Sequence, residues 1–277
     1  MCKTINGNYA GKENPVNNSY RPPYCALVLF VIFSILIAGL SGCSSNSQAL
    51  QTMKADAKEL PENLWNDSKK LVTERENIAV LLIGGGASGA VRCAYDDKIE
   101  DHFEGHHTFP RDFTIGVGSS GSPITHFALA GSGYLYGVMA ENDEMHQVSR
   151  SLIEALSLNG LLTSGLKFIA QDESPNGEKL AWPSGHTSSS ITVATVLNEY
   201  YGPVVGIPLY ALSGLVMYER METGEHWASD VIFGAAIGYT VGKTVADRYK
   251  PEIFGMQVTP FINPQSGVTG VALSKEF

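Results

Sequence analysis

The sequence predicts an all-α fold, a bundle of helices that ends in a small C-terminal β-hairpin. Apolar segments of helical length follow one another through the chain, separated by short breaks that contain Gly, Pro or Asn. No repeating strand–helix pattern accompanies them. Strict alternation of apolar and polar residues occurs only over residues 257–273, around an Asn-Pro-Gln-Ser-Gly turn. With 277 residues, of which 44% are hydrophobic, the chain can build one large domain.

The N-terminal 42 residues have the character of a bacterial export signal. A lead with more Lys and Arg than acidic residues precedes an apolar core over 25–40. The ending Leu40-Ser41-Gly42-Cys43 resembles a lipoprotein box. That resemblance implies cleavage before Cys43, a lipid on its thiol and a domain facing the periplasm, and Ser44 favours the outer membrane. An uncleaved membrane anchor is the alternative. Cleavage would leave Cys93 as a free thiol.

Residues 43–63 are polar and predict a tether to a helical domain over residues 64–250, with residues 251–277 as a hairpin appendage. Helical spacing of apolar residues begins at Leu64 and runs to about Val91. Within it, Gly84–Gly89 matches the G-x-G-x-x-G fingerprint of dinucleotide sites. Because no strand–helix repeat follows, we favour small residues that let helices pack closely.

Five further helices are expected, over residues 124–141, 145–170 with a break near Asn159-Gly160, 187–200, 207–218 and 228–246. Two apolar stretches, about 204–217 and 231–246, are compatible with membrane spans. Pro208, Asp230, Tyr239 and Lys243 interrupt them, which favours buried helices of a soluble bundle.

Composition and charge restrict the classes of function. A formal net charge of −9 without a basic stripe argues against a nucleic-acid binder. His102, Glu104, His106 and His107 are spaced closely enough to suggest a metal site, but such residues in an acidic loop are more often solvated. We expect no metal and no cofactor.

Two stretches carry the chemistry. In Trp182–Ser190, Pro183 suits the first turn of a helix, and Ser184-Gly185 offer backbone N–H groups to an anion. His186 follows, placed to exchange a proton. In Tyr218–Asp230, Arg220 can bind an oxyanion, and His226 and Asp230 are four residues apart, so that Asp230 can orient the imidazole.

Pro-Ser-Gly-His at 183–186, followed by Arg220, His226 and Asp230 at this spacing, resembles the type-2 phosphatidic acid phosphatase (PAP2) family, which shares its helical fold with vanadium haloperoxidases. The resemblance covers about residues 120–246. It implies that His226 attacks phosphorus to form a phosphohistidine, oriented by Asp230, while His186 protonates the leaving oxygen and later activates water. It also implies that the phosphate oxygens bind to a set of four residues, Lys167, Ser184, Gly185 and Arg220.

The chain departs from the family at two positions. The earlier family motif, Lys, six residues, then Arg-Pro, keeps Lys167 and Pro175 but has Ser174 in place of Arg. Glu219 stands where the family usually has Ser. Loss of one bidentate Arg contact costs on the order of 2–4 kcal/mol of transition-state binding. Lys179 is the nearest cation that could substitute.

The leading hypothesis is therefore a metal-independent phosphatase that hydrolyses a lipid phosphate, a pyrophosphate or a small phosphate ester. The alternatives are a non-catalytic, anion-binding envelope lipoprotein and a vanadate-dependent haloperoxidase. Each site residue also has a purely structural interpretation. Ser184 and Thr187 can cap a helix, His186 can be a buried histidine, His226–Asp230 can be a surface pair, and Arg220 can pair with Glu222 or Glu225.

Overall fold

The computed structural model describes residues 46–104, 108–249, 252–253, 256–263 and 268–274. The export signal, Cys43, His106 and His107 lie outside the described residues. The helices are α2 (Asn46–Thr73), α3 (Arg75–Ala94), α4 (Asp96–Phe103), α5 (Arg111–Ser120), α6 (Pro123–Met139), α7 (Asp143–Ala170), α8 (Gly185–Tyr201), α9 (Pro203–Glu222) and α10 (Ala228–Arg248).

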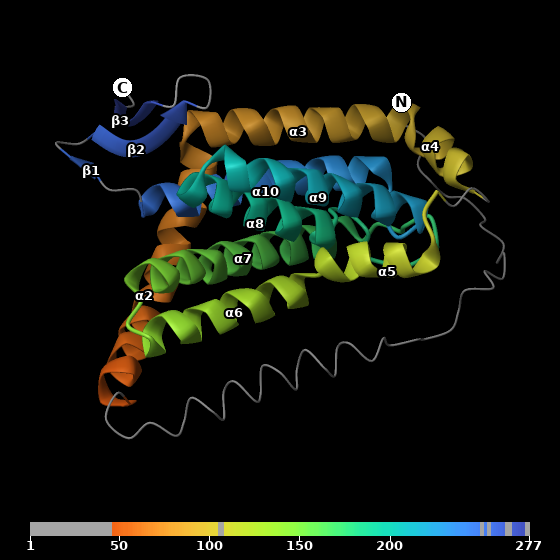
Figure 1. The fold of residues 1–277 in the computed structure, drawn as a ribbon. Coiled ribbons are helices and arrows are strands. Elements are labelled where there is room, and N and C mark those ends of the chain that lie inside the picture. The colour runs from red at the N-terminus through yellow and green to blue at the C-terminus, as the bar shows by residue number, and fades with distance from the viewer. Residues whose placement is uncertain (1–45, 105–107, 250–251, 254–255, 264–267, 275–277) are drawn as a thin grey trace.

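The long helices run side by side along one axis, with α8 and α10 near the centre (Figure 1). Helix α2 crosses one end of this bundle, and α4 and α5 lie at the other end, where α8 and α10 begin. The hydrophobic core is built mainly on α7, α8 and α10 and includes Leu156, Val196 and Val241. The predicted all-α bundle is confirmed.

Three glycines determine how closely α10 approaches α8. Gly234, Gly238 and Gly242 recur every four residues and so share one face of α10. A Cβ atom on Gly238 would lie 2.3 Å from the carbonyl oxygen of Ser188, and one on Gly234 would lie 2.7 Å from that of Ser184. Only residues without a side chain permit this approach, which brings the starts of the two helices together.

The glycine-rich stretch at 84–89 is part of helix α3. A Cβ atom on Gly84 would lie 2.4 Å from the Cβ atom of Ala236 on α10. Small residues therefore allow α3 to pack directly on α10, as we favoured over a dinucleotide site.

The tether expected over residues 43–63 is wrong from Asn46 onward, because helix α2 begins there. Its polar residues pair with other helices. Asp56 accepts hydrogen bonds from the Tyr134 hydroxyl at 2.6 Å and pairs with Arg150, and Asn63 donates to Glu154 at 3.0 Å. A polar segment was thus mistaken for a solvated one because its partners are far away in the sequence.

Helix α7 does not break at Asn159-Gly160, contrary to expectation. The Asn159 side chain donates to the Ser188 hydroxyl at 3.1 Å, a tertiary bond that holds this turn against α8. Helices α6, α8 and α10 lie where they were predicted. Helix α9 is longer than predicted at both ends, starting at Pro203 and including Pro208.

At the C-terminal end, β2 (Met256–Asn263) pairs antiparallel with β3 (Val268–Ser274), in register Gln257 to Ser274, and β1 (Glu252–Ile253) pairs with β2. These strands fall on the segment whose alternation predicts a hairpin.

Helices α3 and α7 are each long and apolar enough to cross a membrane by length and composition. In their most apolar windows, 11% and 33% of the residues are buried. The segments singled out from the sequence lie instead in α9 and α10, and most of α10, Val241 and Val245 included, is buried in the bundle.

Cys93 is disulfide-bonded in the uncleaved chain, whereas the free thiol predicted from the sequence concerns a chain cleaved before Cys43. The other cysteines, Cys2, Cys25 and Cys43, lie outside the described residues. A chain cleaved before Cys43 would retain only Cys43 and Cys93, so within such a chain a disulfide and a lipidated Cys43 exclude each other.

Candidate active site

The N-terminus of α8 forms the floor of the site. Ser184 is the N-cap, and its hydroxyl oxygen accepts a hydrogen bond from the Thr187 amide at 3.4 Å. A Cβ atom on Gly185 would meet nothing within 4 Å, so the first turn borders open space. Pro183 was expected in this turn but precedes the cap, after a cis Trp182–Pro183 peptide bond. Free N–H groups at a helix start favour an anion.

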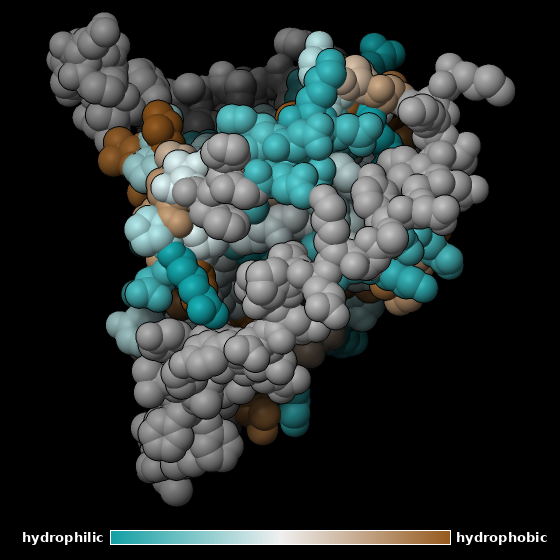
Figure 2. All heavy atoms as spheres, turned by 90° about the vertical axis from the view of Figure 1, so that its right-hand side faces the viewer, coloured by the Kyte–Doolittle hydropathy of each residue, from teal (hydrophilic) through white to brown (hydrophobic). Residues whose placement is uncertain are grey.

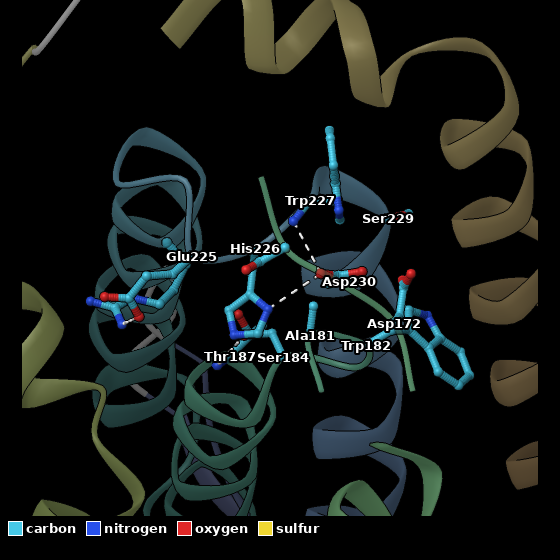
Figure 3. Close-up of polar contacts among 12 residues, drawn as sticks. Asp172, Ala181, Trp182, Ser184, Thr187, Glu225, His226, Trp227, Ser229 and Asp230 are labelled. Atoms are coloured by element: carbon cyan, nitrogen blue, oxygen red, sulfur yellow. Dashed lines mark hydrogen bonds and ion pairs between the residues drawn. The ribbon is translucent and has the colours of Figure 1, made fainter. Parts of the chain in front are cut away.

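His226 and Asp230 lie together above this floor. The imidazole Nδ1 is 3.3 Å from Asp230 Oδ2, and the ring lies between Asp230 and the Ser184–Thr187 turn (Figure 3). His226 is 8% exposed and Asp230 is fully buried, so the pair is not the surface pair of the structural alternative. With Nδ1 on the carboxylate, Nε2 is the nitrogen available for a nucleophilic role.

Asp230 also fastens the two helix starts to each other. Its Oδ2 accepts from the Trp227 amide at 3.0 Å, and its main-chain oxygen accepts from the Ser184 amide at 3.1 Å. Within the described residues, its Oδ1 and the hydroxyl of Thr187 are buried without a hydrogen-bond partner. Buried polar atoms without partners are uncommon in native structures.

Helix α4 holds the start of α10 from outside. Asp96 accepts hydrogen bonds from the Ser229 amide at 3.0 Å and from the Ser229 hydroxyl at 2.5 Å. Burial raises the pKa of Asp96. Sequence reasoning missed this contact, because 133 residues separate its partners and no local pattern marks it.

His186 is partly buried, close to several basic side chains. Burial, together with the charges of Arg220, His226, His126 and Lys167, lowers its pKa to about 3. The predicted acid–base residue is therefore neutral at neutral pH in the unliganded site. The same effect shows that the predicted site residues from three helices lie close enough to interact electrostatically.

Lys167 reaches the site but is bound to the main chain. Its Nζ donates to the carbonyl oxygens of Leu180 and Ala181, the latter at 2.9 Å. Burial lowers its pKa, while the charge of Asp230 raises it. Lys167 thus fixes the loop before α8 and brings a positive charge close to Asp230.

Arg220 is held between carboxylates. Its Nε and one terminal nitrogen donate to Glu219, and the other terminal nitrogen donates to Glu225. Of the two partners in the structural alternative, Glu225 is correct and Glu222 is not. Glu222 accepts instead from the Thr108 amide. The sequence had marked Glu219 as a departure from the family but not as a ligand of its neighbour.

The Ser174 side chain, which stands where the family has Arg, forms its hydrogen bonds within its own turn. Its hydroxyl donates within its own turn, 2.6 Å from Asn176 Oδ1, and accepts from the Glu178 amide at 3.0 Å. Lys179, the cation expected to substitute, is exposed and pairs through its backbone with Glu173. Arg92 of α3 binds Asp172, in the same loop, through two bonds at 2.6 and 2.7 Å.

His126 of α6 was missed in the sequence. It is 9% exposed, and its Nδ1 lies 3.1 Å from the hydroxyl of Ser189, a residue of the first turn of α8. Burial lowers its pKa to about 4. The signal available was a lone histidine in an otherwise apolar helix.

The end of the bundle that carries the site is seen face-on in Figure 2, where hydrophilic side chains gather over the centre of the coloured surface. A small pocket opens beside His226. It is lined by residues of α4 (Ile99, Phe103), by Pro175 and by Met221. Apolar groups thus border one side of a polar site.

The PAP2 superfamily model matches residues 150–251. Over 100 residues, the chain is 34% identical to a lipid A 1-phosphatase of Porphyromonas gingivalis. The matched segment covers 35% of this chain and 22% of that protein. Over 70 residues, it is 39% identical to a decaprenylphosphoryl-5-phosphoribose phosphatase of Mycobacterium tuberculosis, covering 24% of this chain and 36% of that protein. The chain thus spans about a fifth and about a third of the lengths of these relatives.

Among solved structures, the chain is similar to a transmembrane PAP2 type phosphatidylglycerolphosphate phosphatase from Bacillus subtilis. The TM-score is 0.51 at 17% identity, over 61% of this chain and 92% of that one. At this identity the likeness concerns the fold. The residues 150–251 that match the PAP2 superfamily model contain Lys167, the 183–186 turn and the Arg220–Asp230 stretch.

Proposed function

We propose that the protein is a phosphatase that transfers a phosphoryl group from a phosphorylated lipid or small phosphate ester to His226 and then to water. The observation that carries this proposal is the His226–Asp230 pair, buried and oriented toward the N-terminus of α8. A nucleophile held by a carboxylate opposite an anion-binding helix start is the arrangement that phosphoryl transfer requires.

In the first step, His226 Nε2 attacks phosphorus and the bond to the leaving oxygen breaks, which gives a phosphohistidine and a free alcohol. Asp230 stabilises the positive charge that develops on the imidazole. Ser184 supports the phosphate from below, because its oxygen accepts from Thr187 and its hydroxyl hydrogen remains available to donate. The Gly185 amide, Arg220 and the charge of Lys167 complete the oxyanion site.

His186 needs the substrate to act as an acid. Its pKa of about 3 leaves it unprotonated in the empty site. A bound phosphate dianion offsets the neighbouring cations and so raises that pKa, which enables His186 to protonate the leaving oxygen. In the second step, neutral His186 accepts a proton from the water that attacks the phosphohistidine.

The names of two relatives support a phosphorylated lipid as the substrate. They are named as phosphatases of lipid A and of decaprenylphosphoryl-5-phosphoribose, both phosphorylated lipids. We place the protein in the cell envelope, attached through lipidated Cys43 and facing the periplasm at the outer membrane.

The proposed lipid anchor at Cys43 can be tested separately from the enzymatic activity. Mass spectrometry of the N-terminal peptide of the membrane-extracted protein should find Cys43 acylated and Cys93 reduced. A Cys43–Cys93 disulfide in the cleaved chain would contradict this anchor.

A non-catalytic, anion-binding envelope protein is the second candidate. Ser174, bonded within its own turn, and Arg220, occupied by two carboxylates, both favour it. The same two features weaken vanadate binding, so a vanadate-dependent haloperoxidase ranks third.

Phosphate release by the full-length protein in detergent tests the proposal, with an aryl phosphate and a polyprenyl pyrophosphate as substrates and EDTA present. Turnover that persists in EDTA and disappears in His226→Ala supports it. Equal release by the wild type and His226→Ala would favour the non-catalytic candidate. Halide oxidation on adding vanadate together with hydrogen peroxide would favour the haloperoxidase.

A further inference from the structure

Arg220, which the proposed function assigns to anion binding, is already bonded to carboxylates. Glu219 binds the edge formed by Nε and one terminal nitrogen, and Glu225 binds the other terminal nitrogen. Three of the five guanidinium N–H groups therefore already have carboxylate acceptors among the described residues. A phosphate oxygen has to use the remaining two or displace a carboxylate.

The Glu219 contact is enclosed. Glu219 is 4% exposed and Arg220 6% exposed. A Cβ atom on Gly118 of α5 would lie 2.6 Å from an Arg220 terminal nitrogen and 2.9 Å from a Glu219 oxygen, so the backbone of α5 closes over the pair. Solvent screens a charge in such a place weakly, so Glu219 acts on any anion bound to Arg220.

Glu225 differs from Glu219 in its exposure. Its side chain is 37% exposed, so water screens its charge more strongly. Glu222 provides a third case, because it is buried one helical turn from Glu219 but is bonded to the Thr108 amide. Substitutions of these three glutamates can therefore distinguish the effect of direct contact with Arg220 on anion binding from the effects of burial and of charge.

We propose that Glu219 is a specificity-determining residue of this site, an internal counter-anion of Arg220 that weakens the binding of free phosphate. A phosphate group carried on a larger substrate compensates with contacts made by the rest of the molecule. Free inorganic phosphate, the product, has no such contacts and leaves readily. This inference rests on the proposed function and identifies what its site selects, esterified phosphate over the free dianion.

Calorimetric titration of the full-length protein in detergent with inorganic phosphate at neutral pH measures this effect without requiring turnover. We expect Glu219→Gln, which keeps the size and loses the charge, to bind phosphate about tenfold more tightly or better. Glu225→Gln should tighten binding about threefold, since its charge is better screened. Glu222→Gln is the matched control and should change the affinity less than Glu219→Gln does.

Unchanged or weaker phosphate binding by Glu219→Gln would overturn the inference, as would equal tightening by the Glu222→Gln control. Undetectable binding by both wild type and Glu219→Gln would also overturn it. If Glu219→Gln does not fold, as judged by thermal unfolding, Glu225→Gln decides, and an unchanged affinity there counts against the inference. A wild-type protein that binds phosphate but hydrolyses no ester would contradict the proposed function alone.

Discussion

Two buried ion clusters lie at opposite ends of the same bundle, and they are built in opposite ways. At the end crossed by α2, the carboxylate of Glu154 is surrounded by donors, and its two arginine partners also pair with Asp56 and Asp67. Its Oε1 accepts from Asn63 and Arg150, and its Oε2 accepts from Arg248 and Tyr249. At the other end, a single cation, Arg220, is bordered by the carboxylates of Glu219 and Glu225.

The difference lies in how completely each central group is bonded. Each Glu154 oxygen has two donors, which fills its capacity, and the residue is 1% exposed. Arg220 keeps two N–H groups free of carboxylates, beside a helix start that borders open space at Gly185. A fully bonded cluster joins helices together, whereas one with unused donors can receive a ligand.

The largest expected effect concerns the site end. Replacing His226 by Ala removes the nucleophile, and the rate of phosphate release should fall roughly 10³-fold or more. The free energy of unfolding should change little in comparison. His126→Ala is the matched histidine control on α6, and its turnover should exceed that of His226→Ala by at least about tenfold. Equal losses in the two variants would contradict a nucleophilic role for His226.

Glu154→Gln tests the closed cluster. Arg150 and Arg248 would lose their shared buried carboxylate, so the free energy of unfolding in urea should fall by about 2–4 kcal/mol. Glu59→Gln removes an exposed partner of Arg150 and should stay within about 0.5 kcal/mol of the wild type. An equal loss of unfolding free energy in both variants would mean that the burial of Glu154 does not increase its contribution to stability.

Gly238→Ala tests whether close packing of α8 and α10 brings the site together. The added Cβ atom would lie 2.3 Å from the Ser188 carbonyl oxygen, so the helices must separate, at a cost of about 1–3 kcal/mol in unfolding free energy. Turnover should fall as well, because Ser184 and Asp230 would move apart. The control is Gly214→Ala in α9, where nothing lies within 4 Å and the helix should gain up to about 1 kcal/mol. A Gly238→Ala enzyme with wild-type turnover would refute this coupling.

The smallest effect is a pH dependence of stability. The pKa of His186 is about 3 in the folded protein and about 6.5 in the unfolded chain, so between these values only the unfolded chain is protonated. Stability should therefore fall as the pH drops from about 6.5 toward 3. His186→Gln should reduce this slope in urea unfolding at several pH values. An unchanged slope would show that His186 is not held neutral.

Local patterns in the sequence predicted most helices and proposed the candidate site residues. Helices α6, α8 and α10 follow from apolar spacing and from Gly or Pro at their boundaries. The order of Lys167, the 183–186 turn, Arg220, His226 and Asp230 placed the site at the starts of α8 and α10. Helix α2 was missed, because its polar residues are satisfied by Arg150 and Tyr134, which no local pattern could reveal.

The sequence by itself determined the resemblance to the PAP2 family, the helical class and the pairing of His226 with Asp230, because these depend on short spacings along the chain or on an ordered motif. Only the tertiary structure decided the charge of the site. That Glu219 and Glu225 occupy Arg220, that Asp96 holds Ser229 and that Ser174 bonds within its own turn depend on how side chains fold back in three dimensions. The energy of a buried charge is set by its nearest neighbours in space, and a one-dimensional pattern does not specify them.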